Sequence, residues 1–141
     1  MEGVCLVARD EAKRWLSEAL WDLETARILL RERRYNAAAF YAQQAAEKAV
    51  KALLYSINEA PWGHSVRVLL LRYFEATGTR RENLLVDARE LDRHYIPSCY
   101  PNALPEGTPH EAYDRETAER ALAAAKRIIE FVVEEIEKKT G

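Results

Sequence analysis

The chain has 141 residues, of which 48% are hydrophobic and 31% charged, a composition typical of one soluble globular domain. Its net charge of −2 argues against a strongly basic nucleic-acid binder but leaves room for a local basic patch. No apolar run approaches the roughly eighteen residues of a membrane span, and the apolar stretch near the N-terminus is too short for a secretion signal. We therefore expect a single cytoplasmic domain over residues 1–141, with its core at about 10–137 and no association with membranes.

The first two helices are predicted from apolar residues that recur every three or four positions. Residues 10–34 are expected to form a long amphipathic helix that Asp10 caps, and residues 36–58 a second helix that Asn36 caps. The second segment is rich in alanine, which favours helix and lets neighbouring backbones approach closely, so we expect it to be central and largely buried. Phe40 is predicted to project into the middle of its polar stripe, which indicates an interface or a cleft.

A third and a fourth helix follow the break at residues 60–63. Ser65 is expected to cap the third helix and Gly78 to end it. The fourth helix is predicted over residues 81–95, and Pro97 stops it because proline cannot continue the helical hydrogen-bond pattern.

Residues 96–113 hold four of the five prolines and are expected to be irregular. A segment of this length in a compact domain is usually functional or disordered, and the aromatic residues Tyr95, Tyr100 and Tyr113 indicate that it packs onto the domain. A last amphipathic helix is predicted over residues 114–139, capped by its first residue, Asp114. No segment alternates with a period of two, so the predicted fold is all-α: an antiparallel up-and-down bundle of four to five helices.

Most enzyme signatures are missing from the sequence. It contains no glycine-rich phosphate loop, no GxSxG and no HExxH, and His64, His94 and His110 are too scattered for a metal site. Cys5 and Cys99 form no CxxC pair and are expected to be free thiols. We therefore predict no metal and no cofactor.

One cluster of polar residues lies at the end of the fourth predicted helix, in the run ARELDRHYIP at residues 88–97. Arg89 and Arg93 are one turn apart on one face, and His94 and Tyr95 follow directly. A histidine can act as a general base toward a ribose 2′-hydroxyl, while arginines can hold the phosphate and stabilise its charge. This combination fits metal-independent RNA cleavage, with His94 as the base and Arg89 as the phosphate clamp. The alternative interpretation is a set of solvated charges with a histidine that caps the helix C-terminus.

The remaining polar candidates have plainer interpretations as well. Lys48 and Lys51 belong either to the solvated face of their helix or to a cleft shared with the aromatic residue of the polar stripe. His64, in the turn PWGHS, fits a turn or capping residue better than a catalytic one. Arg93, Tyr95 and the two lysines are candidate ligands of a phosphate or a nucleotide.

Three blocks of the sequence resemble the small prokaryotic HEPN-domain proteins that are associated with nucleotidyltransferases. Residues 40–53 (FYAQQAAEKAVKAL) resemble the second helix of that family, residues 61–65 (PWGHS) the turn before its third helix, and residues 91–103 (LDRHYIPSCYPNA) the end of its fourth helix. The blocks occur in the family's order, and the helical pattern resembles that of the family over roughly residues 10–137.

The resemblance implies a helical bundle that forms a homodimer and often has a minimal nucleotidyltransferase as its partner in a toxin–antitoxin pair. Active members of the family are RNases that use an Arg-x(4–6)-His motif from both protomers, and the matching residues here are Arg89 and His94. Other members bind nucleotides or serve as the non-catalytic partner of the nucleotidyltransferase. RNA or a nucleotide is therefore the implied ligand.

Two positions depart from the family's patterns. In one toxin branch the partner adenylylates a tyrosine two residues after the histidine, but Ile96 holds that position here and Tyr95 directly follows His94. In the small single-domain branch, an aromatic residue often stands where His94 stands. Three hypotheses stay open: an endoribonuclease toxin, a non-catalytic binding module, and a purely structural oligomerisation unit.

A nuclease of this kind has structural requirements. His94 should be accessible to solvent and close to Arg89 of its own chain or of the partner chain. On a regular helix these two side chains point about 140° apart. We therefore expect the helix to loosen before Pro97, or a dimer that uses the fourth helix to bring two copies of the motif together.

Overall fold

The computed structural model describes the backbone of residues 2–140 and the side chains of residues 8–139. Within these residues the chain forms helices and no strand, which confirms the all-α class. In chain order the elements are α1 (Glu2–Arg31), α2 (Tyr35–Ser56), α3 (Val66–Thr77), α4 (Glu82–Asp92), the 3-10 turn η1 (Pro101–Ala103), α5 (Pro109–Ala112) and α6 (Arg115–Thr140). The expected free thiol of Cys5 lies outside the described side chains, whereas Cys99 carries an exposed free thiol.

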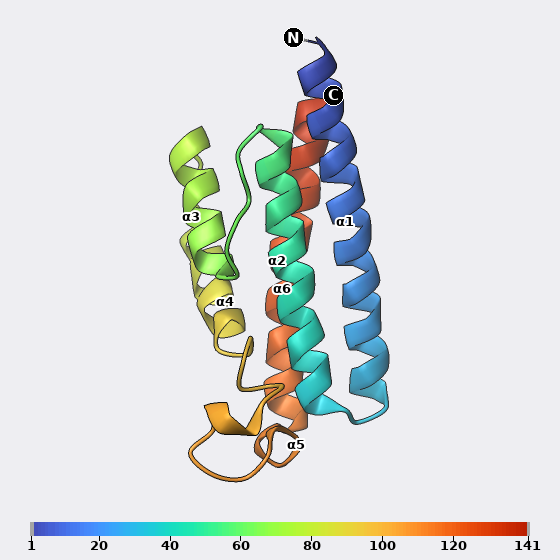
Figure 1. Cartoon of the computed structure of the whole chain (residues 1–141), viewed down its shortest axis with the longest axis vertical. Helices are drawn as coiled ribbons and strands as arrows, with labels where there is room; N and C mark the ends of the chain where they lie inside the picture. The colour runs from blue at the N-terminus through green and yellow to red at the C-terminus, as the bar shows by residue number, and fades with distance from the viewer. Residues whose placement is uncertain (1, 141) are drawn as a thin grey trace.

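The long helices pack side by side in a bundle (Figure 1). α1 lies against α2, which runs in the opposite direction and also packs against α6. Residues 57–65 then return along the bundle, and the shorter α3 and α4 form an antiparallel pair on the other side (Figure 1). Because of this return, α2 and α6 run in the same direction within an otherwise up-and-down bundle.

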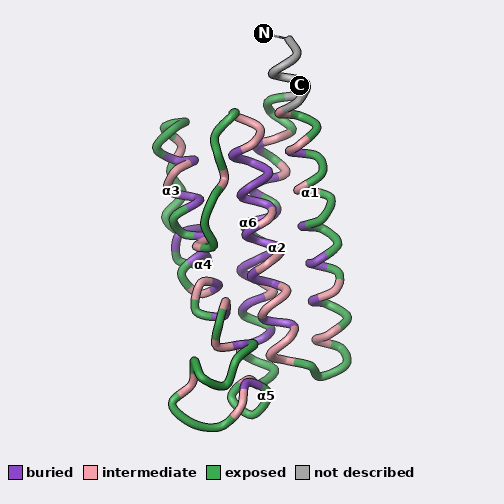
Figure 2. The backbone as a smooth tube through the Cα atoms, viewed as in Figure 1, coloured by how far each residue is buried: buried purple, intermediate pink, exposed green. Residues whose placement is uncertain are grey.

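The core of the bundle runs along α2, whose buried side consists mainly of alanine (Figure 2). Side chains this small let α1 and α6 approach α2 closely, and Leu53, Ile128 and Val132 are among the larger side chains that complete the core. This confirms the prediction that the alanine-rich helix is central and largely buried. Its fully buried alanines are Ala38, Ala39, Ala42, Ala45, Ala46, Ala49 and Ala52.

The first two helices begin elsewhere than predicted. Asp10 lies inside α1 and does not cap it, because the residues before it continue the helix. Asn36 lies inside α2, and its side-chain amide donates a hydrogen bond to the carbonyl oxygen of Ser98 (3.2 Å) instead of capping the helix. The turn before α2 is made by Arg33, which has a positive φ of 62°.

The other helix boundaries are set largely by the residues that the sequence indicates. The Ser65 hydroxyl caps α3 by accepting a hydrogen bond from a backbone N–H three residues on (3.1 Å). Gly78 ends α3 in the left-handed conformation at a φ of 79°, where a residue without Cβ is favoured. Asp114 accepts a hydrogen bond from a backbone N–H in the first turn of α6 (2.8 Å) and so acts as its cap.

α4 ends at Asp92, earlier than predicted, and residues 93–99 form turns. The loosening that we expect before Pro97 is therefore present. Asp92 has a second role, because its carboxylate accepts hydrogen bonds from the Ser65 hydroxyl (2.7 Å) and the Val66 N–H (2.7 Å). The carboxylate therefore accepts hydrogen bonds from groups at the N-terminal end of α3 and connects that end to the end of α4.

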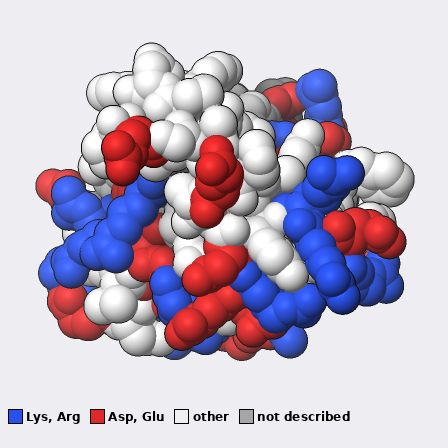
Figure 3. Space-filling model, turned by 90° about the horizontal axis from the view of Figure 1, so that it is seen from below, with Lys and Arg blue, Asp and Glu red and all other residues white. Residues whose placement is uncertain are grey.

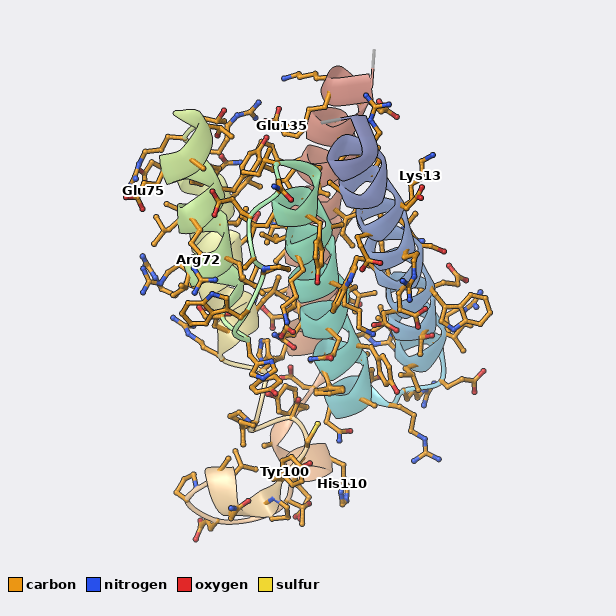
Figure 4. The ribbon with its side chains drawn as sticks, turned by 45° about the horizontal axis from the view of Figure 1, so that its top comes forward. Lys13, Arg72, Glu75, Tyr100, His110 and Glu135 are labelled. Carbon is orange, nitrogen blue, oxygen red and sulfur yellow. The ribbon has the colours of Figure 1, made fainter. Side chains whose placement is uncertain are left out.

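Residues 96–113 form the foot of the bundle, where Figure 4 shows Tyr100 and His110. Tyr113 is partly buried and packs against the core, whereas Tyr100 is 57% exposed. The segment therefore packs down through Tyr113, and the expectation that Tyr100 also anchors it is wrong. Tyr100 follows the turns after α4 and directly precedes η1 at the foot of the bundle, where its side chain faces solvent (Figure 4).

Candidate functional site

His94 lies in the turn after α4, and only 6% of this residue is exposed. Its Nδ1 is 2.8 Å from the hydroxyl oxygen of Tyr113, whose ring packs edge-on against the imidazole. Its Nε2 is 3.4 Å from Oε1 of Glu90, four residues earlier in the chain. The expectation of a solvent-accessible His94 is therefore wrong for this chain, because the segment at the foot of the bundle folds back and places Tyr113 over the ring. Each ring nitrogen therefore lies near a polar group of the chain, Nδ1 near the Tyr113 hydroxyl and Nε2 near the Glu90 carboxylate.

Glu90 is the centre of a charged cluster around this histidine. Besides His94, its Oε1 faces Nε of Arg120 at 3.7 Å, and its Oε2 accepts a hydrogen bond from Arg93 (3.2 Å). Both arginine side chains are mostly exposed, so the cluster opens to the surface. Arg120 also pairs with Glu116 (3.3 Å), so two carboxylates and two guanidinium groups meet in the cluster beside the imidazole.

Burial favours the neutral form of the His94 imidazole. The pKa of His94 is lowered, mainly by burial, and the charges of Arg120 and Arg93 act in the same direction while Glu90 opposes them. Burial also raises the pKa of Tyr113 to about 12, so its hydroxyl keeps its proton at neutral pH. A neutral imidazole is the form that a general base requires.

Arg89 lies in the last turn of α4 with an exposed side chain. It forms no hydrogen bond or ion pair with the residues that the structure describes. The arginines whose charges act on His94 are Arg93 and Arg120. The structure therefore brings Arg93 to His94 through Glu90, but no contact joins Arg89 to His94 within one chain. Seen from the foot of the bundle, basic side chains lie on both flanks with acidic ones among them (Figure 3).

Tyr95 faces a second polar cluster, which extends from α2. Its ring stacks on that of His64, with 4.8 Å between the centroids and 17° between the planes. Nδ1 of His64 lies 3.4 Å from Oε2 of Glu47, and the same oxygen lies 3.1 Å from Nζ of Lys51. The Gln43 amide donates hydrogen bonds to Oε1 of Glu47 (3.1 Å) and to the carbonyl oxygen of His64 (3.2 Å). Two predicted ligand residues, Tyr95 and Lys51, are thus connected through His64 and Glu47.

Lys48 belongs to a different part of the surface. Its Nζ donates a hydrogen bond to Asp22 on α1 (2.6 Å), and it lines an open cleft of about 420 Å³ together with Trp15 and Tyr55. Both lysines are therefore ion-paired rather than simply solvated. The cleft is lined by residues of α1 and α2. Phe40, whose ring packs edge-on against that of Tyr41, is not among them.

Several residues that complete these clusters are not among the predicted site residues: Glu90, Arg120 and Tyr113 around His94, and Gln43, Glu47 and His64 beside Tyr95. Glu90 precedes His94 by four residues and Glu47 precedes Lys51 by four, a spacing that places side chains together on one helix face and is visible in the sequence. Tyr113 reaches His94 only through the folding of the segment between them, so no local pattern predicts this contact.

The end of α4 offers an imidazole, a carboxylate, a phenol and several guanidinium groups, which together can bind a phosphate and move a proton. Among the described side chains, no group of three His, Cys, Asp or Glu residues is placed to hold a metal ion. In the same part of the chain, no helix is both long and apolar enough to cross a membrane.

Because burial lowers the pKa of His94, we predict that the protein loses stability as the pH falls below about 6.5. In the unfolded chain this histidine takes up a proton near pH 6.5, whereas in the folded protein its lowered pKa delays protonation to a lower pH. Between these two values the unfolded state binds more protons, so the free energy of unfolding decreases by up to about 1.4 kcal/mol per pH unit. Urea unfolding over this range measures the slope.

A pair of variants isolates this contribution. A His94→Gln protein should lack this part of the slope, because glutamine does not titrate. A His110→Gln protein should keep it, since His110 lies exposed at the foot of the bundle. Equal slopes for the unaltered protein and His94→Gln would contradict the prediction.

The sequence matches the model of one protein family over most of its length. The model of the HEPN domain matches residues 12–136. A protein of Methanocaldococcus jannaschii that bears the name "Putative toxin" is 28% identical over 138 residues, which cover 92% of this chain and 91% of the relative.

Crystal structures of similar proteins have the same fold. A protein from Thermus thermophilus superposes with a TM-score of 0.85 and is 40% identical, over 89% of this chain and 98% of its own. An archaeal HEPN homologue gives a TM-score of 0.76 at 35% identity, over 89% and 98% of the two chains. An HEPN domain protein from Thermotoga maritima gives 0.69 at 37% identity, over 86% and 95%.

Proposed function

The chain belongs to the HEPN domain family, and we propose that it is the toxin of a toxin–antitoxin pair, with a minimal nucleotidyltransferase as its partner and RNA as its target. The name "Putative toxin" of the Methanocaldococcus jannaschii relative supports the toxin role. The resemblance of the sequence to nucleotidyltransferase-associated members of the family supports the choice of partner. The activity that we propose is metal-independent cleavage of RNA at the end of α4.

The observation that carries this proposal is the placement of the His94 imidazole beside guanidinium groups, which meet it through Glu90. Arg93 lies beside the histidine through Glu90, and Arg89 presents a free guanidinium one turn earlier on α4. Guanidinium groups bind phosphate oxygens in pairs of charge-assisted hydrogen bonds. The end of α4 therefore has groups that hold a phosphate next to a group that accepts a proton.

Cleavage assigns a role to each of these groups. His94 takes the proton of the ribose 2′-hydroxyl, and the 2′-oxygen attacks the neighbouring phosphorus. The bond from phosphorus to the 5′-oxygen breaks, which leaves a 2′,3′-cyclic phosphate and a 5′-hydroxyl. Arg89 stabilises the charge on the phosphate in the transition state. Because Tyr113 covers His94 in the described conformation, bound RNA has to displace this tyrosine before the proton moves.

We further propose that α4 forms the contact of a symmetric homodimer. Val86 on α4 is 60% exposed and lies on the same face as Arg89, three residues later. Burying this side chain against a second copy stabilises the dimer through the hydrophobic effect. In a two-fold contact the same surface meets itself, so Arg89 of one protomer approaches His94 of the other.

The second candidate function is a non-catalytic module that binds a nucleotide or the nucleotidyltransferase. The observation in its favour is the burial of His94, whose two ring nitrogens are both engaged within the chain. On this interpretation, Tyr113 and Glu90 hold the imidazole as a structural group. The exposed arginines then bind phosphate without cleaving it.

Incubating single-stranded RNA with the purified protein in excess EDTA tests both candidates. We expect cleavage products that end in a 2′,3′-cyclic phosphate. A His94→Ala protein should cleave at least about a hundredfold more slowly while still binding the RNA, since loss of a general base costs about 10²–10⁴ in rate. Binding without cleavage by the unaltered protein would contradict the nuclease and support the second candidate. Neither binding nor cleavage would also contradict the nuclease, and would leave the second candidate with a nucleotide or the nucleotidyltransferase, rather than RNA, as its ligand.

A further inference from the structure

We propose that His64 is a second catalytic histidine, which gives a proton to the leaving 5′-oxygen of bound RNA, and that Glu47 is its positioning residue. This inference rests on the proposed function, because it assigns a further residue to the same reaction. It starts from the cluster of Gln43, Glu47, Lys51 and His64 that meets Tyr95.

The geometry of this cluster fixes the imidazole of His64 while leaving it open to a ligand. The His64 side chain is 62% exposed, whereas that of Glu47 is almost fully buried. Nδ1 faces the carboxylate at 3.4 Å, so Nε2, on the opposite edge of the ring, is left for a ligand. The Gln43 amide holds the carbonyl oxygen of the same histidine at 3.2 Å. His64 is thus positioned from α2 through both its ring and its backbone.

Stability alone does not account for the charges that support this histidine. The side chains of Glu47 and Lys51 are both largely buried, and burying an ion pair costs desolvation energy that its attraction often fails to repay. A buried carboxylate that faces one nitrogen of an exposed imidazole is the arrangement by which proteins orient a catalytic histidine.

The ring stack places His64 against the turn that follows α4. Tyr95, on which His64 stacks, directly follows His94, and Arg93 precedes that histidine. One histidine, His94, therefore lies in this turn, and the other, His64, stacks against it in a different environment. Burial lowers the pKa of His94, which suits a base, whereas the side chain of His64 is mostly exposed and open to a ligand.

The proposed cleavage uses one histidine as a proton acceptor and the other as a proton donor. His94 accepts the proton of the 2′-hydroxyl as the bond from the 2′-oxygen to phosphorus forms. The bond from phosphorus to the 5′-oxygen breaks, and its electron pair goes to that oxygen. Nε2 of protonated His64 supplies the proton that makes the leaving group a 5′-hydroxyl. Water then returns a proton to His64 and removes one from His94, so no further reactant is consumed.

Two RNA dinucleotides test this assignment, one with the ordinary 5′-oxygen at the scissile phosphate and one with sulfur in its place. A thiolate leaves without a proton, because a thiol has a pKa of only about 8.5. We expect His64→Ala to slow cleavage of the oxygen substrate at least about a hundredfold but to leave cleavage of the sulfur substrate near the unaltered rate. His94→Ala should be slow on both substrates. Glu47→Gln should show the His64→Ala pattern in weaker form, which a purely structural role would not produce.

The exposed His110 supplies the matched control, and His110→Ala should cleave both substrates at the unaltered rate. Cleavage of the oxygen substrate by His64→Ala at the unaltered rate would overturn this inference and leave the proposed function intact. Equal slowing of His64→Ala on both substrates would also overturn it, since the defect would then not lie in protonation of the leaving group. An unaltered protein that cleaves neither substrate would overturn the proposed function together with this inference. Circular dichroism confirms that each variant is folded.

Discussion

Replacing Arg89 with alanine is expected to slow metal-free RNA cleavage by about a hundredfold, because the transition state then lacks a guanidinium that stabilises the charge on the phosphate. The side chain is exposed at the end of α4 and has no hydrogen bond or ion pair within the described residues, so its removal should leave the melting temperature nearly unchanged. The cleavage rate of Arg89→Lys should fall between the rates of the unaltered protein and Arg89→Ala. Lysine keeps the positive charge but cannot make the two parallel hydrogen bonds of a guanidinium. Initial rates on one RNA measure all three proteins.

Arg27→Ala is the matched control for this experiment, because it removes an exposed arginine near the C-terminal end of α1, a different helix. Its cleavage rate should equal that of the unaltered protein, and a loss as large as that of Arg89→Ala would point to a general effect of surface charge. Light scattering on each variant checks that its oligomeric state is that of the unaltered protein.

Mixing two inactive variants tests whether the site is shared between protomers. If Arg89 of one chain acts with His94 of the other, a heterodimer of Arg89→Ala and His94→Ala contains one intact site. Random exchange of subunits should then restore roughly a quarter of the unaltered rate. If both residues act within one chain, mixing restores nothing, and the proposed contact through α4 would be contradicted.

The central position of α2 is predictable because the information is local. Alanine at so many positions between residues 37 and 52 gives a helix that can be approached from more than one side, and the structure buries it between α1 and α6. Caps with a strong local signature, such as Ser65 and Asp114, were equally visible in the sequence. Asp10 and Asn36 carry the same type of side chain, but the backbone around them continues a helix, and propensity alone does not reveal this.

The candidate site was less predictable because its key contacts join distant parts of the chain. The motif that contains Arg89 and His94 is readable, but the burial of His94 depends on Tyr113, which returns from the far side of an irregular segment. The polar stripe of α2 is readable as well. The partner of this stripe cannot be predicted in the same way, because Glu47 faces His64, which lies in the turn before α3.

Replacing Leu53 with alanine is expected to lower the free energy of unfolding by about 2–5 kcal/mol. This side chain is fully buried on α2, where many of the other buried residues are alanine. Alanine neighbours have no side-chain length with which to fill a void, so the structure around the missing methyl groups can collapse only partly. The cost therefore combines lost burial with an unfilled cavity, and we expect the upper half of the range.

Urea unfolding of Leu53→Ala measures this cost, and Leu20→Ala provides the matched control. Leu20 lies on α1 with a substantially exposed side chain, so the same change of residue there should alter the free energy of unfolding by less than about 1 kcal/mol. Because small domains unfold with a total of about 5–15 kcal/mol, the core variant should show a clearly lower denaturation midpoint. Similar midpoints for the two variants would mean that α2 does not form the centre of the core, and the packing described for α1, α2 and α6 would have to be revised.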